Sequence, residues 1–213
     1  MGRLTKGILG GFAGKVGTVV GSSWRGIDVI RSLPKKSKRT PSAEQAIQRL
    51  KFGLIINFLS PITILLRDYY GSNPNQRTRI NNAVSYHIQE AITGINPDFT
   101  IDYPRVIFSK GELQPLMNLA ATPQAGGDLE FVWTDNSGEG EALTTDMIVI
   151  VAYNDSKKAF ETRQLTASRS AMAYTMSFPN SWVGNTVECW TSVVSANKKL
   201  WGSTIYMGAI VLV

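Results

Sequence analysis

Hydrophobic residues follow two different periods in the first third of the chain. Up to residue 33, glycines are spaced among valines and isoleucines, and this pattern predicts two short strands at about 16–22 and 26–33 with a turn between them. From Ile47 onward, apolar residues recur at steps of three and four, which predicts a helix through about Leu59. Ser42 and Gln45 form a capping-box pattern at its start, and Pro61 predicts a kink or restart before the helix continues to about residue 70.

A second helix is predicted at about 77–93, after a polar break. Ile80, Val84 and His87 share one face of it, so we interpret the single histidine as a residue that packs between helices. Gly94 is expected to stop this helix. The two helices would form an antiparallel hairpin, and residues 98–110 are expected to be extended.

The last hundred residues change to short apolar runs with turn signals between them. Strands are predicted at about 117–121, 128–134, 146–154, 158–164, 170–177, 186–195 and 202–213. Seven strands without helical periodicity indicate an immunoglobulin-like or fibronectin-type β-sandwich. Trp133 and Tyr153 fit buried aromatic positions of such a sandwich, and Cys189 is expected to be a buried, inert thiol.

The predicted fold class is therefore α+β. A glycine-rich β-hairpin, a basic linker and a helical hairpin make up a first region, 1–110, and an all-β sandwich makes up a second, 111–213. The chain is long enough to bury one large core or two small ones.

Charge divides the chain unevenly. Residues 1–52 hold 11 of the 22 lysines and arginines but two of the 16 acids, so they carry +9 and the remainder carries −3. Such an arm could meet phosphates, the acidic surface of a partner, or the acidic part of another copy of the chain. The residues expected to make this contact with an anion or partner are Lys35, Lys36, Lys38, Arg39, Arg49 and Lys51.

Candidate chemistry is sparse. One cysteine and one histidine exclude an internal disulfide and leave too few groups for a zinc site or a histidine-centred triad. Gly11–Lys15 lacks the spacing of a phosphate loop, and no G-x-S-x-G elbow occurs. The acidic stretch Asp135–Glu141, with Asp146 nearby, does not match an EF-hand, so we interpret it as a solvated loop, with cation binding as the alternative. We expect no enzymatic activity, no cofactor, no metal site and no small-molecule substrate.

Targeting signals are not evident in the sequence. The longest apolar runs are shorter than about 18 residues, which predicts no membrane-spanning helix. Lys15 and several glycines interrupt the first apolar patch, so we expect synthesis in the cytoplasm without a Sec signal, and any export by another route.

Several strings carry a resemblance to known sequences. They are GFAGKVGTVVGSSWRGIDVIRS (11–32), TPSAEQAIQRLKF (40–52), AVSYH (83–87), PDFTIDY (97–103), FVWTDNSG (131–138) and VAYN (151–154). Through them nearly the whole chain resembles an uncharacterised family that is widespread in Bacteroidota. The N-terminal hairpin, followed by Thr40, Gln45 and Arg49, is also similar to a module of phage- and prophage-encoded proteins. The resemblance implies a structural or assembly role.

The leading functional prediction is a non-enzymatic subunit of a self-assembling complex, such as a virion, a tail-like particle or a surface filament. Glycine-rich strands have weak register and open edges, and they can join another chain through main-chain hydrogen bonds. The residues assigned to this homo-oligomeric contact are Gly14, Gly17, Gly21, Trp24, Arg25, Gly26 and Arg31. One alternative is a nucleic-acid-binding protein that uses the basic segment. Another is an adhesin or carbohydrate-binding module with exposed Trp182, Trp190 or Trp201.

Overall fold

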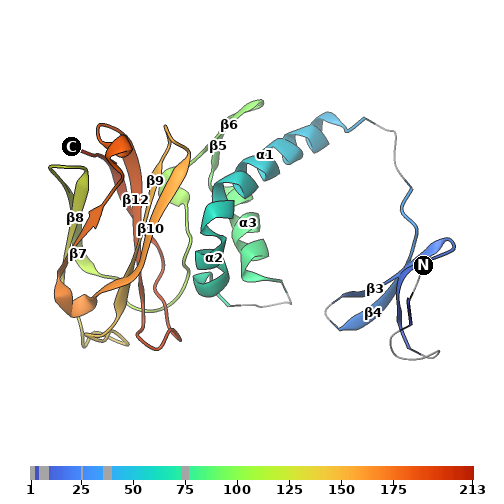
Figure 1. Cartoon of the computed structure of the whole chain (residues 1–213), viewed down its shortest axis with the longest axis horizontal. Helices are drawn as coiled ribbons and strands as arrows, with labels where there is room; N and C mark the ends of the chain where they lie inside the picture. The colour runs from blue at the N-terminus through green and yellow to red at the C-terminus, as the bar shows by residue number, and fades with distance from the viewer. Residues whose placement is uncertain (1–2, 5–9, 25, 36–39, 73–76) are drawn as a thin grey trace. The chain divides into compact units, whose positions relative to one another are not determined.

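The computed structural model describes residues 3–4, 10–24, 26–35, 40–72 and 77–213 (Figure 1). Contacts divide the chain into two compact units, Met1–Ser42 and Ala43–Val213. The predicted boundary at residue 110 does not coincide with this division. The physical reason is that the helices and the sandwich share a hydrophobic core, so both belong to the second unit.

The described residues of the first unit form an antiparallel sheet in the order β1-β2-β3-β4. Its strands are β1 (Arg3–Leu4), β2 (Phe12–Val16), β3 (Val19–Trp24) and β4 (Ile27–Ser32). The predicted strand at 16–22 is wrong in its bounds. Gly17 has a φ of +58°, which favours glycine, and it turns the chain between β2 and β3. Gly26, in the predicted turn before β4, has a φ of +82°.

The helical part of the second unit follows the sequence prediction up to residue 90. It contains α1 (Ala43–Leu59), the 3₁₀ helix η1 (Ser60–Ile62), α2 (Thr63–Tyr69) and α3 (Arg79–Glu90). Pro61 lies in η1, where its missing N–H interrupts the helix as predicted. The Thr78 side chain accepts a hydrogen bond from the Asn81 backbone N–H at 3.2 Å and caps α3.

The chain after α3 differs from the prediction. Residues expected to continue the helix form β5 (Ile92–Ile95), which pairs with β6 (Asp98–Ile101). Gly94 is therefore a strand residue and not a helix stop. It is needed there because a Cβ atom at Gly94 would lie 2.2 Å from the carbonyl oxygen of Asp98. Beyond β6 the chain makes a short 3₁₀ helix, η3 (Tyr103–Arg105), rather than staying extended.

All seven strands expected after residue 110 are present, with shifted ends. They are β7 (Met117–Gln124), β8 (Asp128–Thr134), β9 (Met147–Asn154), β10 (Ala159–Ser168), β11 (Ala173–Ser177), β12 (Thr186–Val194) and β13 (Ile205–Val211). The strand orders are β10-β9-β12-β13 and β11-β8-β7, both antiparallel. Short 3₁₀ helices, η4 (Arg169–Ala171) and η5 (Asn180–Trp182), flank β11. This arrangement confirms an α+β fold with a β-sandwich.

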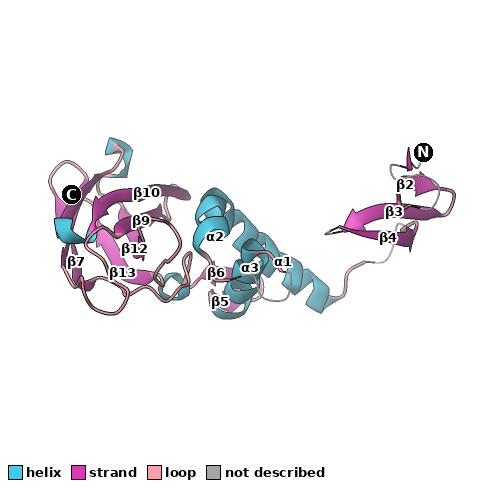
Figure 2. Cartoon of the chain, turned by 90° about the horizontal axis from the view of Figure 1, so that it is seen from below, coloured by secondary structure: helices cyan, strands magenta, loops and turns pink. Residues whose placement is uncertain are grey.

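The four-stranded sheet is buried on both faces. On β9, Ile148 and Ile150 pack in the core between the two sheets, whereas Val149, Val151 and Tyr153 pack in a core shared with the helices. Figures 1 and 2 show α2 and α3 beside this sheet, on the side away from β7 and β8. The unbroken apolar run of β9 follows from this layering, because a strand covered on both faces has no solvent side.

The helical segment Ala43–Tyr69 is long and apolar enough to cross a membrane, by length and composition only. The sequence reading expected no such segment. Its buried side chains pack within the protein, in the helix-sheet core. They are Ile55, Phe58, Leu59, Ile62, Leu65, Leu66 and Tyr69. Packing within the protein thus accounts for part of its apolar character, while Phe52 and Ile64 are exposed.

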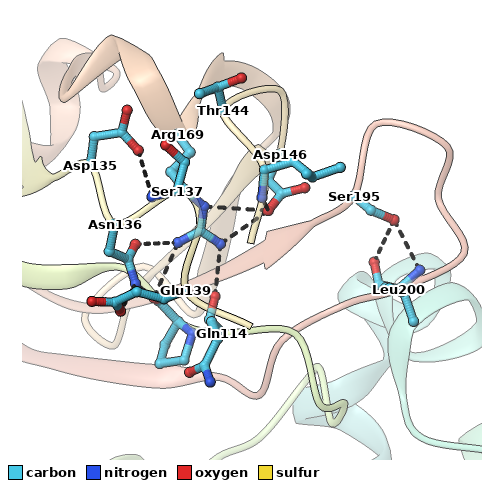
Figure 3. Close-up of polar contacts among 12 residues, drawn as sticks. Gln114, Asp135, Asn136, Ser137, Glu139, Thr144, Asp146, Arg169, Ser195 and Leu200 are labelled. Atoms are coloured by element: carbon cyan, nitrogen blue, oxygen red, sulfur yellow. Dashed lines mark hydrogen bonds and ion pairs between the residues drawn. The ribbon is translucent and has the colours of Figure 1, made fainter. Parts of the chain in front are cut away.

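A fully buried ion pair anchors one end of the sandwich (Figure 3). The Arg169 guanidinium donates to Asp146 Oδ2 from Nε at 3.3 Å and from Nη2 at 3.1 Å. It also donates to the backbone carbonyl of Gln114 at 2.8 Å, to that of Pro115 at 3.2 Å, and to the Asn136 side-chain oxygen.

This guanidinium corrects the interpretation of residues 135–146. Asp146 and Asn136 are buried around Arg169, so this part of the stretch is not a solvated loop. The alternative interpretation was that these acidic residues bind a cation. In the structure the positive charge beside Asp146 is the Arg169 guanidinium. Among the described residues, no group of three or more histidine, cysteine, aspartate or glutamate side chains could hold a metal ion.

Candidate functional site

The N-terminal sheet exposes most of its apolar side chains. Among the described residues of Met1–Ser42, Gly21 is the only one classed as buried. Trp24 and Ile27 are each 57% exposed and Ile30 is 64% exposed. These side chains form an apolar surface that is exposed in the described part of the unit.

The strand register shows which side chains share a face. Trp24 pairs with Ile27, Ser22 with Val29, and Val20 with Arg31, and directly opposed residues lie on the same face of a sheet. Lys15 pairs with Val20 and therefore lies on the same face as these residues. We call this surface the Trp24 face; its residues are Lys15, Val20, Ser22, Trp24, Ile27, Val29 and Arg31. It is apolar at the Trp24 end and basic at the other.

The opposite face of the sheet is partly filled by the chain itself. Gly14 pairs with Gly21, which pairs in turn with Ile30. A Cβ atom at Gly21 would lie 2.0 Å from the Phe12 carbonyl oxygen and 2.7 Å from its ring. Glycine is therefore required at position 21, and the Phe12 ring covers this part of the opposite face.

The predicted assembly residues fall into three groups. Gly14 and Gly21 lie in the strands, and Gly17 and Gly26 lie in the turns. Trp24 and Arg31 lie on the Trp24 face, whereas Arg25 lies outside the described residues. Ile27 and Val29 were not among the predicted assembly residues. Their alternation with Arg31 along the strand could have placed them on the same face.

The sheet also has an open edge. Strand β4 pairs with β3 on one side, and none of the described strands pairs with it on the other. Every residue from Ile27 to Ser32 is exposed. An edge strand of this kind presents main-chain donors and acceptors to another chain.

The predicted basic surface is only partly described. Lys35 is exposed, and Lys36, Lys38 and Arg39 lie outside the described residues. Arg49 is exposed on α1, but Lys51 is half-buried with its Nζ 5.0 Å from the centre of the Phe99 ring. Residues two apart on a helix point roughly 200° apart, so these two cations do not form one patch.

The second unit contains a cleft that the sequence reading did not anticipate. It has a volume of about 520 Å³ and lies between α1, β6 and the ends of β9 and β10. Its apolar lining comes from Leu54, Phe58, Phe99, Tyr103, Tyr153 and Phe160, and we call it the aromatic cleft. The ring centroids of Tyr153 and Phe160 lie 4.6 Å apart, and Phe58 lies 5.1 Å from each.

The polar groups of the aromatic cleft bind one another. The Tyr103 hydroxyl donates to Asp155 Oδ1 at 2.6 Å, and Lys158 Nζ lies 2.6 Å from the same oxygen. The hydrogen bond from Lys158, followed by that from Tyr103, lowers the pKa of Asp155. Burial, followed by the hydrogen bond to Asp155, raises the pKa of Tyr103. Since these charges compensate one another, the cleft suits an apolar group better than an ion.

The tryptophans assigned to a carbohydrate platform are not available for that role. Trp182 and Trp190 are buried in the two cores. Trp201 is half-buried, with the Arg79 guanidinium 4.7 Å from its ring and its Nε1 donating to the Lys110 carbonyl at 2.9 Å. The premise of exposed indoles at Trp182 and Trp190 is therefore wrong.

The lone histidine and the lone cysteine are structural. His87 Nδ1 lies 2.7 Å from the Ala83 carbonyl oxygen, and Nε2 accepts from the Ile107 N–H at 3.2 Å. Burial lowers the pKa of His87, so the neutral imidazole is favoured. Burial also raises the pKa of the Cys189 thiol to about 12. The predicted burial of His87 and Cys189 is confirmed, as is that of Trp133 and Tyr153.

Comparison with known proteins then places the chain among its relatives. Residues 11–208 match the model of a family of unknown function, DUF6266. The chain belongs to this family. The resemblance to an uncharacterised family, predicted from the sequence, is thereby confirmed, and that family is DUF6266. No protein of curated function matches its sequence.

Solved structures similar to this DUF6266 protein are fibronectin type III domains. The fn3 domain of the human collagen alpha-1(XX) chain is 13% identical, with 49% of this chain and 88% of that chain covered and a TM-score of 0.35. The FN5 domain of Drosophila Lar is 10% identical, with 48% of this chain and 96% of that chain covered and a TM-score of 0.32.

Proposed function

We propose that the protein is a non-enzymatic structural subunit that assembles with copies of itself through its N-terminal sheet. The complex would be a virion, a tail-like particle or a surface filament. The observation that supports this proposal is the exposed Trp24 face on a sheet in which Gly21 is the one buried residue among those described. The similarity of the N-terminal segment to phage- and prophage-encoded modules points the same way.

The second unit does not require the first for its own core. Both hydrophobic clusters consist of residues from Ile55 onward. None of the described residues of the N-terminal sheet belongs to either cluster. Assembly would explain both the exposed face and the open edge of β4.

Magnitudes favour contact through several apolar residues of the Trp24 face. Burying one large apolar side chain stabilises by about 1.5–3 kcal/mol. Association costs roughly 4–15 kcal/mol in lost translational and rotational freedom. Trp24 alone could not offset that cost, but Trp24, Ile27 and Val29 together, with main-chain pairing along β4, could.

Light scattering and negative-stain microscopy of the full chain test the proposal, at low and high salt and with and without DNA. We expect defined rings, tubes or filaments from protein alone. Deleting residues 1–33 should leave a folded, β-rich monomer, because both cores remain intact. An oligomer of unchanged size after this deletion would contradict the proposal.

A second function is favoured by the charge of the N-terminal unit. Residues 1–42 contain nine lysines and arginines but one aspartate, Asp28. Such a charge density can bind nucleic acid by releasing counterions from phosphates. If the full chain is a monomer that changes size only with DNA, and this effect weakens steeply with salt, nucleic-acid binding replaces assembly as the function.

A further inference from the structure

The charge of each unit limits what can cover the Trp24 face. Residues 1–42 carry a formal charge of +8, and Lys15 and Arg31 lie on the Trp24 face itself. Two such faces packed against each other would bring like charges together, which is costly. Residues 43–213 hold 13 bases and 15 acids, a formal charge of −2. Electrostatics therefore favours the second unit as the partner of the first.

Within the second unit, the aromatic cleft has the chemistry to receive the Trp24 end. Tryptophan and tyrosine are the side chains that most often anchor protein interfaces, and they do so by filling pockets. A Trp ring buries roughly 150–250 Å² and gains further from edge-to-face contact with other rings. The cleft offers the half-buried rings of Phe99, Tyr103 and Phe160 for such contacts in a volume of about 520 Å³, whereas Phe58 and Tyr153 in its lining are buried.

The position of Trp24 suits insertion into a cleft. It is the last residue of β3, at the apolar end of the Trp24 face, and it is 57% exposed. Its cross-strand neighbour Ile27 is equally exposed and would enter with it. Lys15 and Arg31 lie further along the face, so these two charges would stay outside the cleft.

We infer that the aromatic cleft of one copy binds the Trp24–Ile27 end of the N-terminal sheet of a second copy. The inference rests on the proposed self-assembly and names its receptor surface. The two surfaces in contact are different, so the interface is heterologous. Copies joined in this way can exchange their N-terminal sheets in a two-fold dimer, close into a larger ring or continue as a filament.

Complementation between two variants of the full chain tests this interface. Trp24→Ala removes the inserted ring and keeps the cleft. Asn57→Phe fills the cleft from an exposed position on α1 and keeps Trp24. Each variant alone should be a monomer by light scattering. A 1:1 mixture should form a heterodimer, because the cleft of one variant still accepts the Trp24 of the other.

Two matched variants are the controls. Ile30→Ala removes a 64% exposed side chain from the opposite face of β4 and should assemble like the wild type. Asn57→Ala removes the amide without filling the cleft and should also assemble normally. Circular dichroism spectra matching the wild type verify that the variants are folded.

Fluorescence provides a second measurement. Trp133, Trp182 and Trp190 are buried and Trp201 is half-buried, so Trp24 is the most exposed of the five indoles. The difference between the wild-type and Trp24→Phe emission spectra reports on Trp24. This difference should shift to shorter wavelength as protein concentration rises and the cleft fills.

Different failures identify which proposal is wrong. A monomeric wild type with a solvent-exposed Trp24 at all concentrations would overturn self-assembly. Normal assembly of Asn57→Phe alongside a monomeric Trp24→Ala would overturn the cleft as receptor but keep assembly through the sheet. Monomeric single variants that do not combine on mixing would contradict head-to-tail contact. A monomer with Trp24 shielded regardless of concentration would mean that the cleft holds the indole of its own chain.

Discussion

The two units of this chain use their apolar residues in opposite ways. In residues 43–213, side chains such as Ile150 and Trp190 are completely buried in two clusters that share the four-stranded sheet. In the N-terminal sheet, more than half of the surface of each of Trp24, Ile27 and Ile30 is exposed. The difference teaches that the second unit has hydrophobic cores of its own, whereas the first leaves most of its apolar side chains exposed.

Arginines show the same contrast. Arg169 has all three guanidinium nitrogens bonded within the sandwich and no exposed surface. Arg31 is exposed on the Trp24 face. A buried guanidinium specifies the packing of its surroundings, whereas an exposed one is available to steer an approaching surface.

The largest effect is expected from removing the buried cation. Arg169→Met should destabilise the protein by about 3–5 kcal/mol, because it leaves the buried Asp146 carboxylate without its ion-pair partner. Urea unfolding of the full chain measures this change. Arg163→Met is the control, since its ion pair with Glu161 is partly exposed and worth about 0–1 kcal/mol. Equal losses in both variants would show that Arg169 is not the anchor.

A smaller effect, confined to the other unit, is expected at Gly21. In Gly21→Ala the new Cβ would clash with the Phe12 carbonyl oxygen, and overpacking of this kind costs about 1–3 kcal/mol. Amide hydrogen exchange over residues 12–32 should accelerate, while the exchange of β9 should be unchanged. Faster exchange of β9 amides in this variant would contradict the independence of the two units.

Gly53→Ala is the matched control for this substitution. Its Cβ would meet nothing within 4 Å, and it lies in α1, where alanine is favoured over glycine by about 0.8–1.0 kcal/mol. It should stabilise the second unit and leave the N-terminal sheet unaffected.

The smallest effect concerns pH. Burial lowers the pKa of His87 below its ordinary value of 6.5, so the unfolded chain binds a proton more readily than the folded one. Stability should be at its full value above pH 6.5 and should fall as the pH drops from 6.5 toward the lowered pKa. Protonation would place an N–H on Nε2, which accepts from the Ile107 N–H.

Urea unfolding midpoints at pH 7.5 and 5.5 measure the effect of His87. The fall between them should be smaller in His87→Gln, which cannot take up the proton. An equal fall in this variant would assign the pH dependence to other groups.

Local patterns predicted much of the fold. Helix α1 and its interruption were predictable because the signals for them act within a few residues. These signals are the capping box at Ser42, the apolar repeat of three and four residues from Ile47, and the break at Pro61. The seven strands of the sandwich were predictable for the same reason. The hairpin β5–β6 was not, because Ile92 continues the helical period of α3 and only its pairing with Ile101 makes it a strand residue.

Trp24 and Trp190 illustrate what the sequence determines and what only the tertiary structure decides. The sequence predicts a strand around Trp190 but a turn at Trp24, which is the last residue of β3. The sequence alone also determines the basic N-terminus and the scarcity of catalytic groups. Trp190 is buried because its ring packs in the core that the sheet shares with the helices. Its Nε1–H donates to the backbone carbonyl of Tyr103, 87 residues away, at 3.1 Å. The aromatic cleft likewise combines α1, β6 and β10, and the Trp24 face depends on pairing across β3 and β4. Burial is decided by neighbours distant in sequence, which only the folded chain brings together.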